Sequence, residues 1–219
     1  MYSGPVAACA FVLLEPSRGI VQRVVLLGPS HHVAFDGLAV PSNTDFETPL
    51  GRIPIDESAR RLLLDLPFVQ VLDDAHHWEH SLEVQLPFLQ EVLGAFAVLP
   101  IAVGRANAEL VTEALETLWG GDETLVVVSS DLSHYHDYET AKRMDEGTSE
   151  AIEALDSARL TRQDACGCIG VQGLLVAAQR HSLIARTLDL RNSGDTAGGS
   201  AEVVGYGAWA FTVSKNGSP

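Results

Sequence analysis

The clearest indication of the fold is a short apolar run that ends in a turn and two histidines, Val21-Gln-Arg-Val-Val-Leu-Leu-Gly-Pro-Ser-His-His32. The unbroken block Val24–Leu27 is typical of a strand covered on both faces, as in a parallel sheet flanked by helices. The pair Gly28-Pro29 should end this strand sharply, so that His31 projects into a crevice beyond it. The alternative is an ordinary turn whose histidines are solvated or cap a neighbouring backbone.

Further strand-like runs alternate with segments of helical period along the whole chain. The other predicted strands are 38–41, 69–72, 97–103, 124–129, 183–190 and 203–213, and the predicted helices are 6–14, 56–66, 81–93, 106–119, 138–155 and 171–181. Pro87 should kink the third helix or mark its true start. The pattern predicts an α/β fold: one three-layer domain, residues 1–219, around a central mostly parallel or mixed sheet.

Composition excludes several classes of partner. The net charge is −15 and no run of Lys or Arg occurs, so nucleic acid and anionic membranes are not expected to bind. The three cysteines are too few for a disulfide framework, which favours a reducing compartment. No apolar run approaches the roughly 20 residues of a membrane span. We therefore expect a cytoplasmic protein.

Histidines carry the functional signal. Seven of the eight fall in three clusters, each directly after a predicted strand: His31 and His32; His76, His77 and His80; His134 and His136. Ligands of open α/β sheets bind beyond the carboxyl ends of strands, so the three clusters are expected to converge on one crevice. Imidazoles with nearby carboxylates suit iron, copper or zinc.

The second and third clusters each allow two interpretations. If residues 77–83 are helical, His77, His80 and Glu83 share one face; the alternative is a capped helix start with Glu79 complementing the helix dipole. Asp131 and His134 are spaced as a carboxylate that orients a general base; alternatively, Asp131 caps the next helix. Ser129 and Ser133 lack the Gly-x-Ser-x-Gly motif of a hydrolase nucleophile.

Two further segments carry weaker signals. The stretch Asn192-Ser-Gly-Asp195 has the composition of a turn or loop, from which Asp195 could still reach the crevice. Cys166-Gly-Cys168 is more typical of small buried thiols than of a zinc site, which prefers a wider spacing.

At these residues the sequence closely resembles the Memo family, known in bacteria as protein B of the AmmeMemoRadiSam system, whose fold resembles the class III extradiol dioxygenases. The matching pieces are Tyr2-Ser-Gly-Pro-Val-Ala-Ala8, Gly28-Pro-Ser-His-His32, Glu79-His-Ser-Leu-Glu-Val-Gln-Leu-Pro87, Ser129-Ser-Asp131 with His134, and Asn192-Ser-Gly-Asp195 leading to Val203-Val-Gly-Tyr206. They run from end to end of the chain in the family's order.

In the dioxygenases two His and one carboxylate hold iron, and another His acts as acid and base. The resemblance implies that His31 is a metal ligand, that Asp195 or Thr196 occupies the third ligand position, and that His134 with Asp131 transfers protons. Residues implied to line the site are Ser30, His32, His80 and Glu83. The implied cofactor is non-heme iron or copper.

The resemblance also implies a departure at the N-terminus. Relatives carry a strand ending in Pro-His-Ala-Gly just before the segment that matches Tyr2, and its His is the first metal ligand. This chain starts at Met1. We therefore expect a domain without its N-terminal strand, with weak metal binding and with the apolar surface of Val24–Leu27 exposed.

Three functions follow as hypotheses. The leading one is a metal-binding crevice with redox or oxygen-linked chemistry on an unknown small molecule. The second is a non-enzymatic module that binds a peptide or the other AmmeMemoRadiSam proteins. The third is a hydrolase with a metal-bound water. One scaffold hosts many functions, so the fold does not decide among them.

Overall fold

The structure is a computed structural model that describes residues 2–213. The chain forms two compact units. Residues 14–129 make the continuous unit, and residues 2–13 with residues 130–213 make the split unit. The two units are described in turn, and the predicted single domain stays a prediction.

The continuous unit is built on a five-stranded sheet with the order β5-β2-β6-β1-β7. Its strands are β1 (Arg23–Pro29), β2 (Leu38–Val40), β5 (Val69–Val71), β6 (Ala97–Val103) and β7 (Thr124–Val128). β1 pairs in parallel with β6 and β7, and β5 in parallel with β2, whereas β2 runs antiparallel to β6. This mostly parallel sheet confirms the predicted fold class. A separate hairpin joins β3 (Asp45–Thr48) to β4 (Gly51–Pro54).

The segment Val24–Leu27 lies at the centre of the continuous unit. It is fully buried, and β1 has a neighbouring strand on each side. Side chains on both faces of such a strand leave water, which explains its unbroken apolar sequence. The predicted exposure of this segment is therefore wrong.

Five helices belong to the continuous unit: α2 (Glu57–Leu64), α3 (Asp74–His77), α4 (His80–Glu83), α5 (Leu86–Leu93) and α6 (Ala108–Leu118). The predicted helix 81–93 is divided, and Pro87 lies in the first turn of α5. This position suits proline, whose missing N–H has no partner there anyway, and it confirms that Pro87 marks the true start. Because α3 ends at His77 and α4 begins at His80, these residues do not share one helical face.

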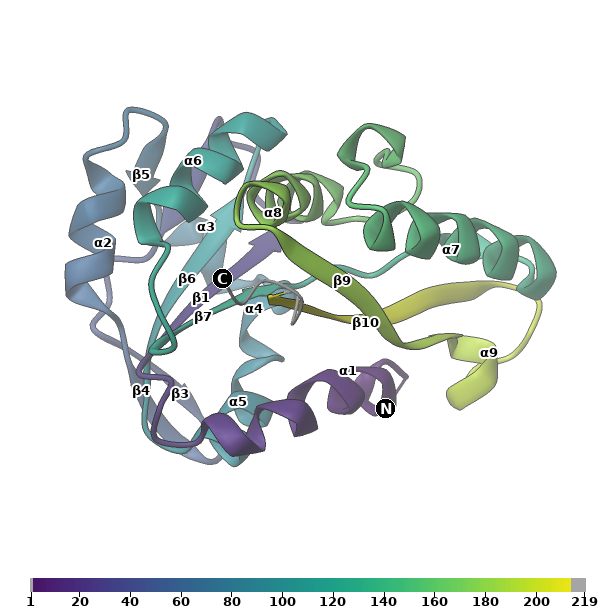
Figure 1. Cartoon of the computed structure of the whole chain (residues 1–219), viewed down its shortest axis with the longest axis horizontal. Coiled ribbons are helices and arrows are strands. Elements are labelled where there is room, and N and C mark those ends of the chain that lie inside the picture. Colours follow the sequence, from purple (N-terminus) through teal and green to yellow (C-terminus); the bar gives the residue numbers. More distant parts are fainter. Residues whose placement is uncertain (1, 214–219) are drawn as a thin grey trace, which may run out of the picture. The chain divides into compact units, whose positions relative to one another are not determined.

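The split unit is a three-layer assembly around the antiparallel sheet β8-β10-β9, where β8 is His134–His136, β9 is Leu183–Asn192 and β10 is Val203–Val213. Figure 1 shows α1 (Gly4–Phe11) on one side of β9 and β10, and α7 (Tyr138–Glu153) with α8 (Cys168–Arg180) on the other. Val6 packs with Tyr206 on the first face. On the second, Ile152 packs with Trp209.

Shorter elements complete the chain: the 3-10 helices η1 (Val12–Ser17) and η2 (Ser157–Arg159), and the one-turn helix α9 (Ser193–Thr196). α9 replaces the loop predicted there. Within residues 2–213, none of the helices combines the length and apolar character that crossing a membrane would need.

Candidate functional site

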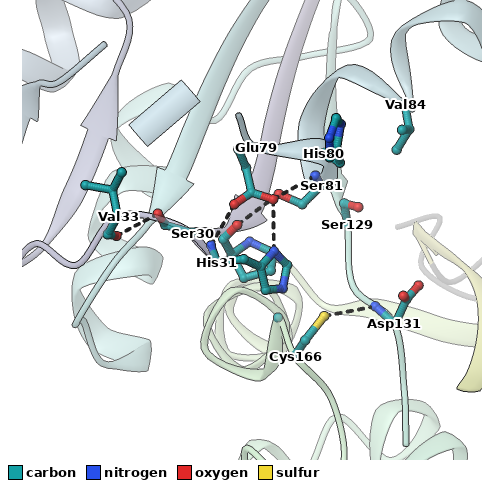
Figure 2. Close-up of polar contacts among 12 residues, drawn as sticks. Ser30, His31, Val33, Glu79, His80, Ser81, Val84, Ser129, Asp131 and Cys166 are labelled. Atoms are coloured by element: carbon teal, nitrogen blue, oxygen red, sulfur yellow. Dashed lines mark hydrogen bonds and ion pairs between the residues drawn. The ribbon is translucent and has the colours of Figure 1, made fainter. Parts of the chain in front are cut away.

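In the continuous unit, His31 is held by the carboxylate of Glu79 (Figure 2). The His31 Nδ1 lies 2.9 Å from Oε1 of Glu79, and the His31 backbone N–H donates to Oε2 at 2.6 Å. The Glu79 side chain is only 2% exposed, whereas that of His31 is 46% exposed. A buried carboxylate thus orients an imidazole that is half-exposed, and the projection of His31 into a crevice stays a prediction.

Local packing places Glu79 beside the end of β1. Glu79 is the N-cap of α4 and accepts a hydrogen bond from the Ser81 N–H at 2.9 Å. The Ser81 hydroxyl donates to the Pro29 carbonyl at 2.9 Å. A Cβ on Gly28 would overlap the Ser81 side chain, so this glycine permits the close approach of α4 to β1.

The route of the chain to this position differs from the prediction. β5 runs opposite to β1, because β2 is antiparallel to β6, so the two strands end at opposite edges of the sheet. The segment that contains α3 then carries the chain back until Glu79 reaches His31. The premise that all three clusters follow strand ends at one edge is therefore wrong for the second cluster.

Glu79 is ionised at neutral pH. Burial acts to raise the pKa of its carboxyl, but hydrogen bonds from the His31 N–H, the His31 ring and the Ser81 N–H outweigh it and hold the pKa below its usual range. A carboxylate here accepts the proton on Nδ1 of His31, which leaves the lone pair on Nε2. A fixed tautomer of this kind is the usual preparation of a histidine for metal binding or proton transfer.

The other predicted residues of the continuous unit occupy separate positions. His80 Nδ1 pairs with Glu83 Oε1 at 2.6 Å on the exposed side of α4, and this hydrogen bond raises the pKa of His80. Ser30 donates to the Val33 carbonyl at 2.8 Å, and His32 is exposed. Ser30 adjoins His31 in the chain, and the role of His80 and Glu83 in lining the site stays a prediction.

In the split unit, His134 is oriented by a backbone carbonyl. Its Nδ1 lies 2.7 Å from the Leu132 carbonyl oxygen, which fixes the proton on Nδ1 and leaves the lone pair on Nε2. Helix α7 is capped by Asp137, so the alternative that Asp131 caps it is wrong. The Asp131 N–H points to the Cys166 sulfur at 3.3 Å (Figure 2). Burial and then the charge of Asp131 raise the pKa of Tyr206 to about 12.

Asp195 has a structural role in α9. Its Oδ2 accepts the Asn192 N–H at 2.9 Å and completes a capping box, while Oδ1 accepts the Tyr138 hydroxyl at 2.6 Å. The Thr196 hydroxyl donates to the Ser193 carbonyl at 3.3 Å. Both predicted residues for the third ligand position are therefore already engaged in local hydrogen bonds.

No set of three His, Cys, Asp or Glu side chains gathers to hold a metal ion within residues 2–213. The expectation that His31, His80, His134 and Asp195 line one crevice involves both units and stays a prediction. Sequence reasoning placed Glu79 at a helix start, where it is the N-cap of α4, but missed its pairing with His31. It also missed Asp145, which is buried in the middle of α7. A signal for Asp145 was present, because it follows Ala141 by one helical turn on the packed face.

Comparisons with known proteins agree on one family. A family model described as Memo-like protein matches residues 1–210. A MEMO1 family protein of Thermotoga neapolitana is 37% identical, over 94% of this chain and 77% of the relative. A MEMO1 family protein of Aquifex aeolicus is 34% identical, over 94% and 80%. The crystal structure of the uncharacterized Escherichia coli K12 protein JW3007 has a similar fold, with a TM-score of 0.58 at 15% identity, covering 91% of this chain and 92% of that one.

Proposed function

Because the chain belongs to the Memo family, we propose that it carries out proton-transfer chemistry on a small molecule, with His134 as the acid and base and His31 as a binding imidazole. The observation that carries the proposal is the orientation of His31 by a buried, ionised Glu79. Burying a charged carboxylate costs free energy, so a chain that does so beside a half-exposed imidazole favours a functional use of that imidazole.

His134 supports the same proposal. Its proton on Nδ1 is bound to the Leu132 carbonyl, so Nε2 is the nitrogen that can take a proton from a substrate and return it. A carbonyl fixes the tautomer without adding charge, which suits a group that must alternate between neutral and protonated forms. Asp131, three residues earlier, is proposed to act with it, as the sequence spacing suggested.

Weak metal binding is part of the proposal. A non-heme iron site typically needs two His and one carboxylate, and no group of three candidate ligands gathers within residues 2–213. Iron or copper is proposed to bind weakly, through Nε2 of His31, with Glu79 as the partner that orients this ligand. Asp195 and Thr196 remain the proposed third position, although both already serve α9.

The proton-transfer proposal is tested by turnover. Oxygen consumption and product formation with a panel of catechols would be compared between the wild type, His134→Gln and the neighbouring substitution His136→Gln. His134→Gln should lower kcat by at least about 10²-fold, the usual share of a positioned acid or base, while His136→Gln should leave most of it. The proposal fails if no member of the panel turns over, or if His134→Gln leaves kcat unchanged without unfolding the protein.

The metal proposal is tested separately. Protein purified anaerobically would be analysed for elements and then titrated with Fe(II) and with Cu(I), using His31→Ala and the adjacent, exposed His32→Ala as a matched pair. We expect substoichiometric metal in the wild type, with weak binding lost in His31→Ala and kept in His32→Ala. Tight stoichiometric binding, or binding that survives His31→Ala, would contradict the ligand assignment.

A second candidate function is recognition of a peptide or of another AmmeMemoRadiSam protein without catalysis. It is favoured by exposed apolar side chains near α4: Trp78 is 67% exposed, and Val84 follows the end of that helix. Exposed aromatic residues are often binding anchors. Trp78→Ala should then abolish binding of the partner, whereas His134→Gln should leave that binding unchanged. The catalytic proposal instead expects the larger loss of function from His134→Gln.

A cytoplasmic location is also proposed. Cys9, Cys166 and Cys168 are all free thiols in the described residues, as expected where glutathione and thioredoxin keep thiols reduced.

A further inference from the structure

A buried carboxyl that the proposed function does not use lies beneath the turn that carries His134. Asp145, in the middle of α7, is only 3% exposed, and its Oδ1 accepts the Ser133 backbone N–H at 3.0 Å. Burial raises the pKa of this carboxyl, against the hydrogen bonds from Ser133 and the nearby His134 and His136, which lower it. A buried acid at mid-helix costs stability, so a specific role for its hydrogen bond is expected.

The same turn is held from its other side by β10. The Gly205 N–H donates to the Ser133 carbonyl at 2.8 Å, and the Leu132 N–H donates to the Gly205 carbonyl at 2.9 Å. Together with Asp145, these bonds fix the backbone of Leu132 and Ser133 between α7 and β10. The Leu132 carbonyl is thereby aimed at Nδ1 of His134.

Gly205 and Asp145 are matched to each other. A Cβ on Gly205 would overlap the Asp145 carboxyl group, so the absence of a side chain at this position is what leaves room for the acid. The register of β10 against β8 also shifts here, between Val203 and Val204. The next residue after His134, Tyr135, has a φ of 60°, a conformation that a bulky side chain rarely adopts. Strained backbone of this kind clusters at functional sites.

We propose that Asp145 is a positioning residue that orients the His134 imidazole through the Ser133 N–H and the Leu132 carbonyl, with Gly205 providing its space. Asp145 does not touch the substrate. It acts by fixing the one peptide group between Leu132 and Ser133: Asp145 accepts its N–H, and its carbonyl determines which nitrogen of His134 carries the proton. The catalytic consequence of this inference rests on the proposed function, whereas the orientation of His134 does not.

The first readout is therefore independent of turnover. In ¹⁵N-labelled full-length protein, the His134 ring signals, assigned with His134→Gln, report which tautomer is present. The wild type should show one tautomer protonated on Nδ1. Asp145→Ala should convert it to a mixture with the Nε2-protonated form, and Asp145→Asn should keep the single tautomer, because an amide oxygen can still accept the Ser133 N–H. The control is Glu146→Ala, at the adjacent exposed position of α7.

A second pair of variants keeps the test decisive if Asp145→Ala does not fold. Gly205→Ala should displace the Asp145 carboxyl and move the His134 signals in the same direction, whereas Gly147→Ala, on the same helix with open space around it, should not. The inference is overturned if neither Asp145→Ala nor Gly205→Ala changes the His134 tautomer in folded protein, or if Glu146→Ala and Gly147→Ala change it equally.

Turnover then separates this inference from the proposed function. With an active substrate, Asp145→Ala should lower kcat by up to about 10²-fold, the scale expected for a misplaced catalytic group, with little change in KM, and Asp145→Asn should restore most of it. A changed tautomer together with unchanged kcat would support the positioning of His134 while contradicting its catalytic role. An unchanged tautomer with a lowered kcat would contradict the positioning alone.

Discussion

One histidine in each unit is fixed through the same ring nitrogen, but by a different group. His31 and His134 both engage a partner through Nδ1, but the partner of His31 is the carboxylate of Glu79 and the partner of His134 is a backbone carbonyl. A carboxylate adds a negative charge that stabilises a protonated or metal-bound imidazole, whereas a carbonyl only selects the tautomer. This difference is consistent with the proposed roles, binding by His31 and reversible proton transfer by His134.

The two buried carboxyls near these histidines differ in a related way. Glu79 accepts hydrogen bonds from two backbone N–H groups and from the His31 ring, and its pKa is lowered. Asp145 accepts one backbone N–H, from Ser133, and its pKa is raised. Burial acts to raise both pKa values, and the larger number of hydrogen bonds to Glu79 reverses the direction of its shift. Burial alone is a poor guide to charge.

The largest loss of stability is expected from Glu79→Ala. The substitution removes the acceptor of two backbone N–H groups and of the His31 ring, and a buried donor without a partner costs about 1–3 kcal/mol. We expect the free energy of unfolding in urea to fall by about 3 kcal/mol, with the ¹⁵N signals of His31 showing both tautomers. Glu83→Ala is the matched control, since its pair with His80 is exposed and should contribute little. Equal losses in the two variants would contradict the assigned role of Glu79.

A smaller loss of stability is expected from Gly205→Ala. This substitution tests whether Asp145 is held firmly beneath the turn that carries His134. The added methyl group must displace the Asp145 carboxyl, and overpacking of this kind costs about 1–3 kcal/mol. Gly147→Ala, inside α7 with open space, should instead stabilise the protein by about 0.5–1 kcal/mol through helix propensity. Urea unfolding of both variants measures the contrast, and a neutral Gly205→Ala would show that Asp145 is free to move.

The pH dependence of stability should have opposite signs for the two carboxyls. Glu79 has a folded pKa below its ordinary value of 4.5, so its contribution is fully present above pH 4.5 and is lost as pH falls through the folded pKa. Asp145 has a folded pKa above 3.8, so its contribution is present below pH 3.8 and is lost as pH rises through the folded pKa.

This contrast can be measured with Glu79→Gln and Asp145→Asn, unfolded in urea at several pH values from 3 to 8. Relative to the wild type, Glu79→Gln should be destabilised at neutral pH and lose that deficit on acidification. Asp145→Asn should gain relative stability as pH rises from about 4. Parallel profiles for the two variants would contradict the assigned protonation states.

Much of the fold could be predicted because the buried strands are unbroken apolar runs. Strands β6 and β10 have the predicted bounds, and β1 lies within two residues of its prediction. The hairpin β3-β4 and the short strand β8 were missed, since their residues are mostly polar and too few to show a period. The helix α9 was missed because its capping box has the composition of a turn.

The site was predictable only where it depends on local sequence. His31 lies just beyond β1 as predicted, but Gly28 and Pro29 still pair with β6, so the prediction that they end the strand is wrong. The carbonyl partner of His134 is only two residues away. The pairing of Glu79 with His31 spans 48 residues and depends on the direction of β5, which no local pattern reveals. Asp145 was missed because one acidic residue on the packed face of α7 is outweighed by its apolar neighbours.

The smallest effect is expected at Tyr135, whose backbone separates His134 from His136. With a φ of 60° and a side chain that is 74% exposed, Tyr135 has a strained backbone and little packing to offset it. A left-handed conformation costs a non-glycine residue about 1 kcal/mol. Tyr135→Gly should remove this strain and leave stability unchanged or higher by up to about 1 kcal/mol, because the greater freedom of glycine in the unfolded chain offsets part of the gain. Tyr135→Ala is the matched control, since it removes the same ring but keeps the strain, and should be less stable than Tyr135→Gly. If the two variants are equally stable in urea, the strain is absent. If Tyr135→Gly is more stable but shows both tautomers of His134, the strained backbone takes part in orienting His134. The Leu132 carbonyl would then need more of the surrounding fold to hold His134 than the Glu79 carboxylate needs to hold His31.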